Sequence, residues 1–388
     1  MTTFEQTVAA TRPTQRTRTA LVHRHLDAWL IGGISIIVFA LMFILVPKDA
    51  DIGQVSWTTF YLAFLINGPH FFASYWHIYV DNARRLREPR FAFAGFVVPA
   101  LLIGGLIVAS QRGNDKTLGH MVNLMYLSVG WHYVKQIFGV TLVSSAAHGR
   151  PVGGWPKKLL RLNLLTIWLM SWVFTNQYAW TSNRGFFGVT YSSADITGFL
   201  NDNGLSFVGD HLRLTVYVLV ATTAAAALGG FAHQWIVTGK TLAPVGWVAW
   251  ASIYVWYLPV LAHPAYFYFV PLFHSLQYLL FSVTFSWNKA AGDDVAPSLM
   301  TDRQRRQQFV MRFAVFVAFA FVLGAAGFHW LPEYLDRNVD YRPNQLGGHF
   351  WVVAFNLFIN IHHYFVDSVI WRGSNPQVRK YLRPRSAS

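Results

Sequence analysis

The chain has 388 residues, of which 54% are hydrophobic, 17% are aromatic and only 12% are charged. Soluble domains carry about 25% charged residues, so this composition excludes a disordered chain, a collagen and an ordinary soluble enzyme. The absence of cysteine excludes disulfides, cysteine-ligated zinc, iron–sulfur clusters and thiol catalysis, and the net charge of +14 is typical of membrane-protein loops that face anionic lipid, with no nucleic-acid partner expected.

Ten apolar stretches are long enough to be membrane helices, which need roughly 20 residues to cross a hydrocarbon core of about 30 Å. They predict an all-α, polytopic membrane bundle with three regions: a basic tail over residues 1–27, one transmembrane domain over 28–371 and a second basic tail over 372–388. In chain order the stretches are Ala28–Val46, Thr58–Val80, Phe91–Ser110, Leu118–Leu142, Leu160–Thr175, Leu214–Ile236, Val245–Leu261, Pro264–Trp287, Phe309–Trp330 and Gly347–Trp371.

The basic residues predict the orientation of this bundle. With both termini in the cytoplasm, 23 of the 31 lysines and arginines fall on the cytoplasmic side, 7 fall on the outer side, and Lys135 lies within a span. Basic residues concentrate in cytoplasmic loops of membrane proteins. The distribution therefore favours ten spans with both ends inside, in a multi-pass protein of a bacterial inner membrane.

Six histidines lie deep within four of the ten stretches, all of which run from outside to inside. His70 and His77 lie in the second, His132 in the fourth, His274 in the eighth, and His362 and His363 in the tenth. At 1.5 Å of rise per residue, all except His77 fall within about 9 Å of membrane depth, with His77 two turns deeper. Ionisable residues in a bilayer turn toward the bundle interior and are usually functional. We therefore expect one shared site.

A site built from histidine suits iron, copper or zinc rather than magnesium or calcium. We expect His70, His132, His274 and His363 to be its catalytic metal ligands. His77 and His362 are expected as further ligands. An imidazole ligand usually donates the N–H of its second ring nitrogen to a carboxylate or an amide. The expected partners share a helix face with one of the histidines and are Asp81, Gln136, Gln277 and Asp367. Either aspartate could instead be a direct ligand, or simply a charge at a helix end.

Three kinds of function are compatible with this pattern. One or two non-haem irons could activate O2 against a lipophilic substrate that enters from the lipid, with an electron-donor protein as a possible partner. Alternatively, paired histidines could bind haem and carry electrons, although the single depth of the histidines fits a compact metal site better. A proton-coupled transporter is weaker, because the sequence shows no internal repeat.

The same motifs resemble the Brp/Blh-like β-carotene 15,15′-dioxygenase family of membrane enzymes. The resemblance rests on Pro69-His70, His132-Tyr133, Phe273-His274-Ser275 and the run from His363 to Asp367. After His70 and after His274, this sequence departs from the motifs of the family. The resemblance implies an iron-dependent oxidoreductase that uses O2 to cleave an isoprenoid such as a carotenoid. Because the histidines lie within the hydrocarbon layer, where lipophilic molecules are plentiful, another isoprenoid or an acyl chain is also an expected substrate.

Overall fold

The computed structural model describes residues 21–45, 65–112, 115–177, 185–186, 189–190, 194–261, 266, 269–290, 301–339 and 349–382. These residues are almost entirely helical. They also include a short antiparallel hairpin of two strands with two residues each, β1 (Gly185–Phe186) and β2 (Val189–Thr190). The helices are α1 (Arg24–Ala28), η1 (Trp29–Gly33), α2 (Ile34–Leu45), α4 (Asn67–Trp76), η2 (His77–Asp81), η3 (Ala83–Arg87), α5 (Pro89–Ala92), η4 (Phe93–Val97), α6 (Val98–Arg112), α7 (Asp115–Ala147), α8 (Gly154–Gln177), α9 (Ile196–Asp202), α10 (Ser206–Asp210), α11 (Leu212–Thr238), α12 (Pro244–Tyr257), η5 (Pro259–Leu261), α13 (Val270–Ala290), α14 (Asp302–Ala325), η7 (Ala326–Trp330), α15 (Leu331–Asn338), α16 (Phe350–Ile370) and α17 (Pro376–Leu382).

The all-α prediction is confirmed, and the number of membrane spans is supported only in part. Within the described residues, four helical runs are long and apolar enough to cross a membrane: His25–Ile44, Pro89–Gln111, Leu212–Thr238 and Arg306–Asn338. The helices that carry the predicted site, α4, α7, α13 and α16, are not among these four runs. Residues 58–64 of the second predicted span lie outside the described residues.

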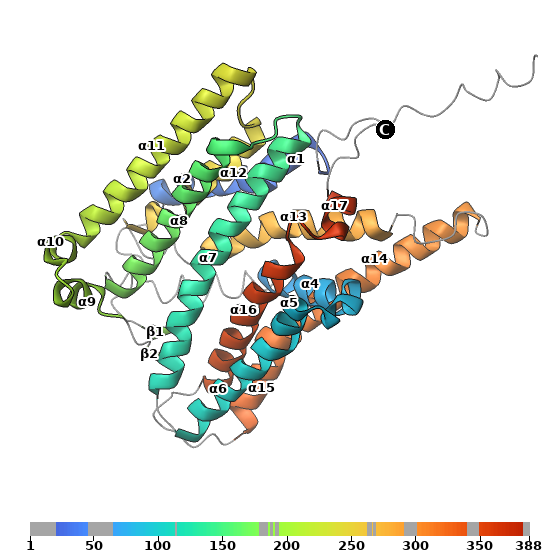
Figure 1. Cartoon of the computed structure of the whole chain (residues 1–388). Coiled ribbons are helices and arrows are strands. Elements are labelled where there is room, and N and C mark those ends of the chain that lie inside the picture. The colour runs from blue at the N-terminus through green and yellow to red at the C-terminus, as the bar shows by residue number, and fades with distance from the viewer. Residues whose placement is uncertain are drawn as a thin grey trace, which may run out of the picture.

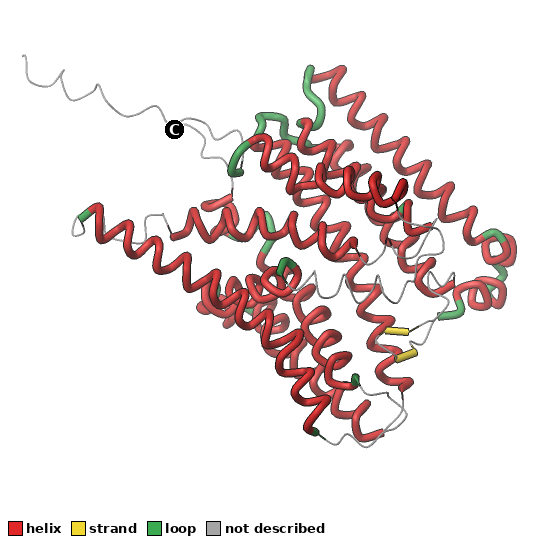
Figure 2. The backbone as a smooth tube through the Cα atoms, turned by 180° about the vertical axis from the view of Figure 1, so that it is seen from behind, coloured by secondary structure: helices red, strands yellow, loops and turns green. Residues whose placement is uncertain are grey.

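The helices form two groups that are joined by two long helices. Figure 1 shows α2, α8, α11 and α12 on one side of the molecule and α4, α6, α14, α15 and α16 on the other, with α7 and α13 running between them. The view from behind in Figure 2 shows the same division, with the short hairpin at the edge. Each group has its own hydrophobic cluster, and α7 contributes to both.

The predicted site lies where these two clusters meet. On α7, Met125 packs in the cluster of the α16 group, and Tyr133 packs in the cluster of the α8 group. His132 falls between them in the sequence. The fold therefore places one predicted ligand at the boundary of the two apolar cores.

Two other features hold α16 and α13 in place. Asp336 on α15 accepts hydrogen bonds from the backbone amides of Trp351 and Val352, at 2.8 and 3.3 Å, which satisfies free donors in the first turn of α16. Directly after α16 in the chain, α17 packs on α13 and buries Val378 and Tyr381. Part of the predicted C-terminal tail is therefore a docked helix.

A glycine pair sets the distance between α4 and α14. A Cβ atom added to Gly324 would lie 2.8 Å from the backbone carbon of Gly68, and one added to Gly68 would lie 3.4 Å from Gly324 Cα. Only Pro69 separates Gly68 from His70. The close packing of α14 therefore helps to position the first predicted ligand.

We expect Gly324→Ala to destabilise the protein by about 1–3 kcal/mol, because the added methyl group meets rigid backbone. Gly229→Ala on α11 is the matched control, since a Cβ there meets nothing within 4 Å. Thermal unfolding of the two purified variants measures the difference. Equal stability of both variants would contradict the packing argument.

Candidate metal centre

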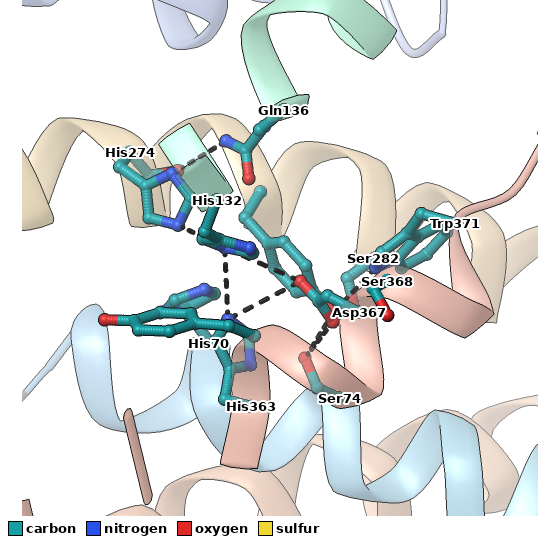
Figure 3. Close-up of polar contacts among 12 residues, drawn as sticks. His70, Ser74, His132, Gln136, His274, Ser282, His363, Asp367, Ser368 and Trp371 are labelled. Atoms are coloured by element: carbon teal, nitrogen blue, oxygen red, sulfur yellow. Dashed lines mark hydrogen bonds and ion pairs between the residues drawn. The ribbon is translucent and has the colours of Figure 1, made fainter. Parts of the chain in front are cut away.

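Four buried histidines from four helices converge at one point. They are His70 on α4, His132 on α7, His274 on α13 and His363 on α16, and one ligand atom from each lies within 4.8 Å of all the others. Figure 3 shows their rings pointing toward one another. This group, called the four-histidine cluster below, could hold a metal ion.

Within two pairs of cluster helices, the contacts advance in the same order along both helices. His70 faces His363, with ring centroids 4.4 Å apart, and one turn later Ser74 hydrogen-bonds to Asp367. The contacts thus advance together along α4 and α16. Likewise His132 contacts His274, and Gln136 contacts Gln277.

The nitrogen positions fit a metal ion. His132 Nε2 lies 3.1 Å from His274 Nε2 and 3.3 Å from His363 Nε2. Metal–nitrogen bonds of about 2.1 Å place ligand nitrogens about 3.0–4.2 Å apart, depending on the bond angle. The 4.8 Å limit of the cluster is about 0.6 Å wider than the largest of these separations. Small side-chain movements therefore suffice for all four imidazoles to bind one ion.

Several polar atoms at the cluster have no partner of their own. Among the described residues, His70 Nε2 and Asp367 Oδ2 are buried and make no hydrogen bond, and the same holds for the Nδ1 atoms of His274 and His363. Buried polar atoms normally have a partner, and an exception points to a missing ion or water. A cation held between the imidazoles would give His70 Nε2 and Asp367 Oδ2 a partner of opposite polarity.

Asp367 is oriented by a chain of donors. Its Oδ1 accepts hydrogen bonds from Ser74 Oγ at 2.8 Å and from the Tyr278 hydroxyl at 3.1 Å, and Trp371 Nε1 donates to that hydroxyl at 3.0 Å. Its Oδ2 lies 3.5 Å from His363 Nε2 and 3.7 Å from His132 Nε2. One carboxylate oxygen is thus held by protein donors, while the other is presented to the cluster.

The structure places His77 and His362 outside the cluster, although the sequence suggests them as further ligands. His77 Nδ1 bonds to Asp81 Oδ2 and its Nε2 bonds to Ser282 Oγ, both at 2.7 Å. His362 Nε2 donates to the Ala94 carbonyl at 3.0 Å, and its Nδ1 accepts from the Tyr75 hydroxyl at 3.2 Å. Both ring nitrogens of each histidine are therefore already engaged.

The remaining predicted residues have different surroundings from one another. Gln136 donates to the backbone carbonyl of His274 and to Gln277 Oε1, at 3.0 and 2.9 Å. Gln277 in turn donates to the carbonyl of Ile31, so the two amides tie α7, α13 and η1 together. Asp81, the last residue of η2, pairs with His77 Nδ1 and with Lys289 Nζ, both at 2.7 Å. It therefore has partners of its own outside the cluster.

Aromatic rings surround the imidazoles. Phe71 lies 4.6 Å from His363, Tyr133 lies 4.4 Å from His274, and Tyr364 lies 4.9 Å from His132, measured between ring centroids. All three side chains are buried. The cluster thus lies in an apolar setting in which hydrogen bonds and charges act strongly.

Three polar residues near the cluster are absent from the predicted set: Ser74, Ser275 and Tyr278. Ser275 Oγ lies 3.0 Å from His70 Nδ1. A signal for it exists in the sequence, because Ser275 and Ser282 have the same spacing of seven as His70 and His77. The structure pairs them in that order, each serine with one imidazole.

Comparison with known proteins adds no identity. The chain has no significant match to a protein-family model, a curated protein or a solved structure. The function has to be inferred from the geometry of the four-histidine cluster.

Proposed function

We propose that the chain is a multi-pass protein of a bacterial inner membrane that binds non-haem iron at the four-histidine cluster and oxygenates a lipophilic substrate. The observation that carries the proposal is the convergence of four buried imidazoles, with their ligand atoms within 4.8 Å of one another. Iron bound there would supply the one-electron chemistry that lets O2 react with an organic substrate. The resemblance to the β-carotene dioxygenases is compatible with this reaction class.

The residues of the chain have separate tasks in this proposal. His70, His132, His274 and His363 would hold the ion. Asp367, whose Oδ2 lies 3.5 Å from His363 Nε2 and 3.7 Å from His132 Nε2, would either bind the ion or place a negative charge beside it. Phe71, Tyr133 and Tyr364 keep the imidazoles in apolar surroundings. A carotenoid, another isoprenoid or an acyl chain is a suitable substrate, because such molecules are concentrated in the membrane beside these helices.

The compactness of the cluster favours a single ion over haem. A porphyrin has to fit between its two axial imidazoles, whereas here each of the four rings packs against two of the others. Ring centroids of His70, His132, His274 and His363 lie 4.4–5.0 Å apart for the contacting pairs His70–His274, His70–His363, His132–His274 and His132–His363. Copper would fit the same nitrogen donors, so the metal itself has to be measured.

The test is product formation from candidate lipids by purified, iron-loaded protein, with and without O2. We expect turnover only with O2, incorporation of ¹⁸O from ¹⁸O2, and a spectrum without a Soret band. Cleavage of a C=C bond places one atom of O2 in each of two carbonyl products. Hydroxylation instead places one atom in the product and one in water, and takes two electrons from a donor protein.

A Soret band in the purified protein would contradict the proposal and favour haem. Equal turnover without O2 would contradict an oxygenase of either kind. Elemental analysis of the same sample identifies the metal and gives its amount per chain, which separates one ion from two.

A further inference from the structure

The hydrogen bonds around His70 determine which of its ring nitrogens carries the hydrogen. Ser275 Oγ lies 2.6 Å from Asn67 Oδ1 and 3.0 Å from His70 Nδ1. The first distance falls within the range of O–H···O bonds, about 2.5–3.0 Å, and is shorter than N–H···O bonds, which begin at about 2.7 Å. Ser275 has one hydroxyl hydrogen, which it donates to Asn67, so it accepts the hydrogen bond from His70 Nδ1.

This assignment leaves His70 Nε2 with a free lone pair. A neutral imidazole has one N–H and one acceptor nitrogen, so an N–H at Nδ1 makes Nε2 the acceptor. His70 Nε2 is buried without a hydrogen-bond partner in the described part of the chain, and His70 is a member of the four-histidine cluster. The ring therefore presents the correct nitrogen, in the correct protonation state, to a metal ion.

The other three histidines of the cluster are not held in this way. The Nδ1 atoms of His274 and His363 are buried without a partner among the described residues. Their Nε2 atoms contact His132 Nε2, and a hydrogen bond between two such nitrogens needs a hydrogen on one of them. Their protonation pattern thus depends on mutual contacts that metal binding must replace.

We propose that Ser275 and Asn67 are positioning residues that fix His70 as the tautomer able to bind metal through Nε2, which makes His70 the pre-organised ligand of the cluster. The proposal rests on the proposed function only in that the cluster binds a metal ion. Partners that orient a metal-binding histidine typically contribute 10–100-fold to metal affinity.

The chain contains a matched control for this idea. Ser282 lies seven residues after Ser275 on α13, both serines are fully buried, and its hydroxyl lies 2.7 Å from His77 Nε2. Each serine thus contacts one imidazole of the α4–η2 segment. His77 is outside the cluster, so loss of the Ser282 hydroxyl removes a similar hydrogen bond without touching a ligand.

The first experiment compares cobalt(II) and iron(II) affinity of the full-length purified protein by competition with a chelator. We expect Ser275→Ala to weaken metal binding by about 10–100-fold, and Ser282→Ala to change it by less than about twofold. Asn67→Asp keeps an oxygen acceptor for Ser275 and should bind metal within a few-fold of the wild type, whereas Asn67→Leu should resemble Ser275→Ala. Thermal unfolding of the metal-free variants shows whether each retains its fold.

The second experiment reads the tautomer directly, by ¹⁵N NMR of histidine-labelled, metal-free protein. His77, His148 and His211 also place Nδ1 against an oxygen that can only accept, so the His70 signal is assigned as the one that disappears in His70→Gln. We expect that signal to be a neutral imidazole with its hydrogen on Nδ1 in the wild type and in Ser282→Ala, and to be altered in Ser275→Ala.

Equal metal affinity of Ser275→Ala and the wild type would overturn the proposal while leaving the metal centre intact, as would equal losses in the two serine variants. A wild-type protein that binds neither cobalt nor iron would contradict the proposed function. In that case the NMR signal still decides the tautomer of His70.

Discussion

Replacing His132 by alanine is expected to remove the metal from the protein and to abolish oxygen-dependent turnover. Its Nε2 atom lies 3.1 Å from His274 Nε2 and 3.3 Å from His363 Nε2, so this imidazole links the ligands of two other helices. The loss of metal affinity should exceed the roughly 10–100-fold that removal of a supporting partner costs. His274→Ala should have the same effect. Metal content per chain and product formation are the measurements.

His362→Gln is the matched control for these variants. His362 is a buried neighbour of His363 on α16, but it bonds to Tyr75 and to the Ala94 carbonyl. Glutamine keeps a donor and an acceptor, so we expect full metal content and turnover. All three variants should reach the membrane in similar amounts, because the apolar segments that drive insertion are unchanged. Wild-type metal content in His132→Ala would contradict the proposed site.

Two elementary constraints made the four members of the cluster predictable from the sequence. Polar residues within apolar helices turn toward the bundle interior, and a fixed rise per residue converts sequence position into depth. Applied to His70, His132, His274 and His363, they identify one common level, and the structure brings these four residues together.

The same geometry explains why His77 and His362 lie outside the cluster. His77 follows His70 by seven residues, which is about 10.5 Å along a helix, too far for one ion with bonds of about 2.1 Å. Adjacent residues on a helix point about 100° apart, so His362 and His363 cannot both face one point at close range. The structure directs His363 to His70 and His362 to Ala94.

Other features depend on contacts between helices that are distant in the sequence. The partner of Gln136 is the backbone of His274 rather than the ring of His132, and Ser74 reaches Asp367 across 293 residues. Helix periodicity assigns a residue to a face, but it does not say which neighbouring helix covers that face. Among the described residues, α11 is one of the four helical runs long and apolar enough to cross a membrane, whereas α16, which carries Asn356, Asn360 and Asp367, is not.

Replacing Asp367 by asparagine is expected to weaken metal binding or activity by roughly 10–100-fold, less than the loss of a histidine ligand. Asparagine keeps an oxygen that can accept hydrogen bonds from Ser74 and Tyr278, as Oδ1 does at 2.8 and 3.1 Å. It replaces Oδ2 by an NH2 group, which has donors and no negative charge to offer. In the wild type, Asp367 Oδ2 lies 3.5 Å from His363 Nε2 and 3.7 Å from His132 Nε2, so its replacement acts directly at the cluster.

Asp81→Asn is the control, because Asp81 pairs with His77 and Lys289 and does not belong to the cluster. We expect it to leave metal affinity within about twofold of the wild type. Equal losses of metal affinity in Asp367→Asn and Asp81→Asn would show that negative charge on these helices supports metal binding wherever it lies. The carboxylate at the cluster would then have no special role. Complete loss of metal in Asp367→Asn, as in His132→Ala, would identify Asp367 as a direct ligand. A carboxylate that only places negative charge beside the ion leaves the four imidazoles able to bind when it is replaced.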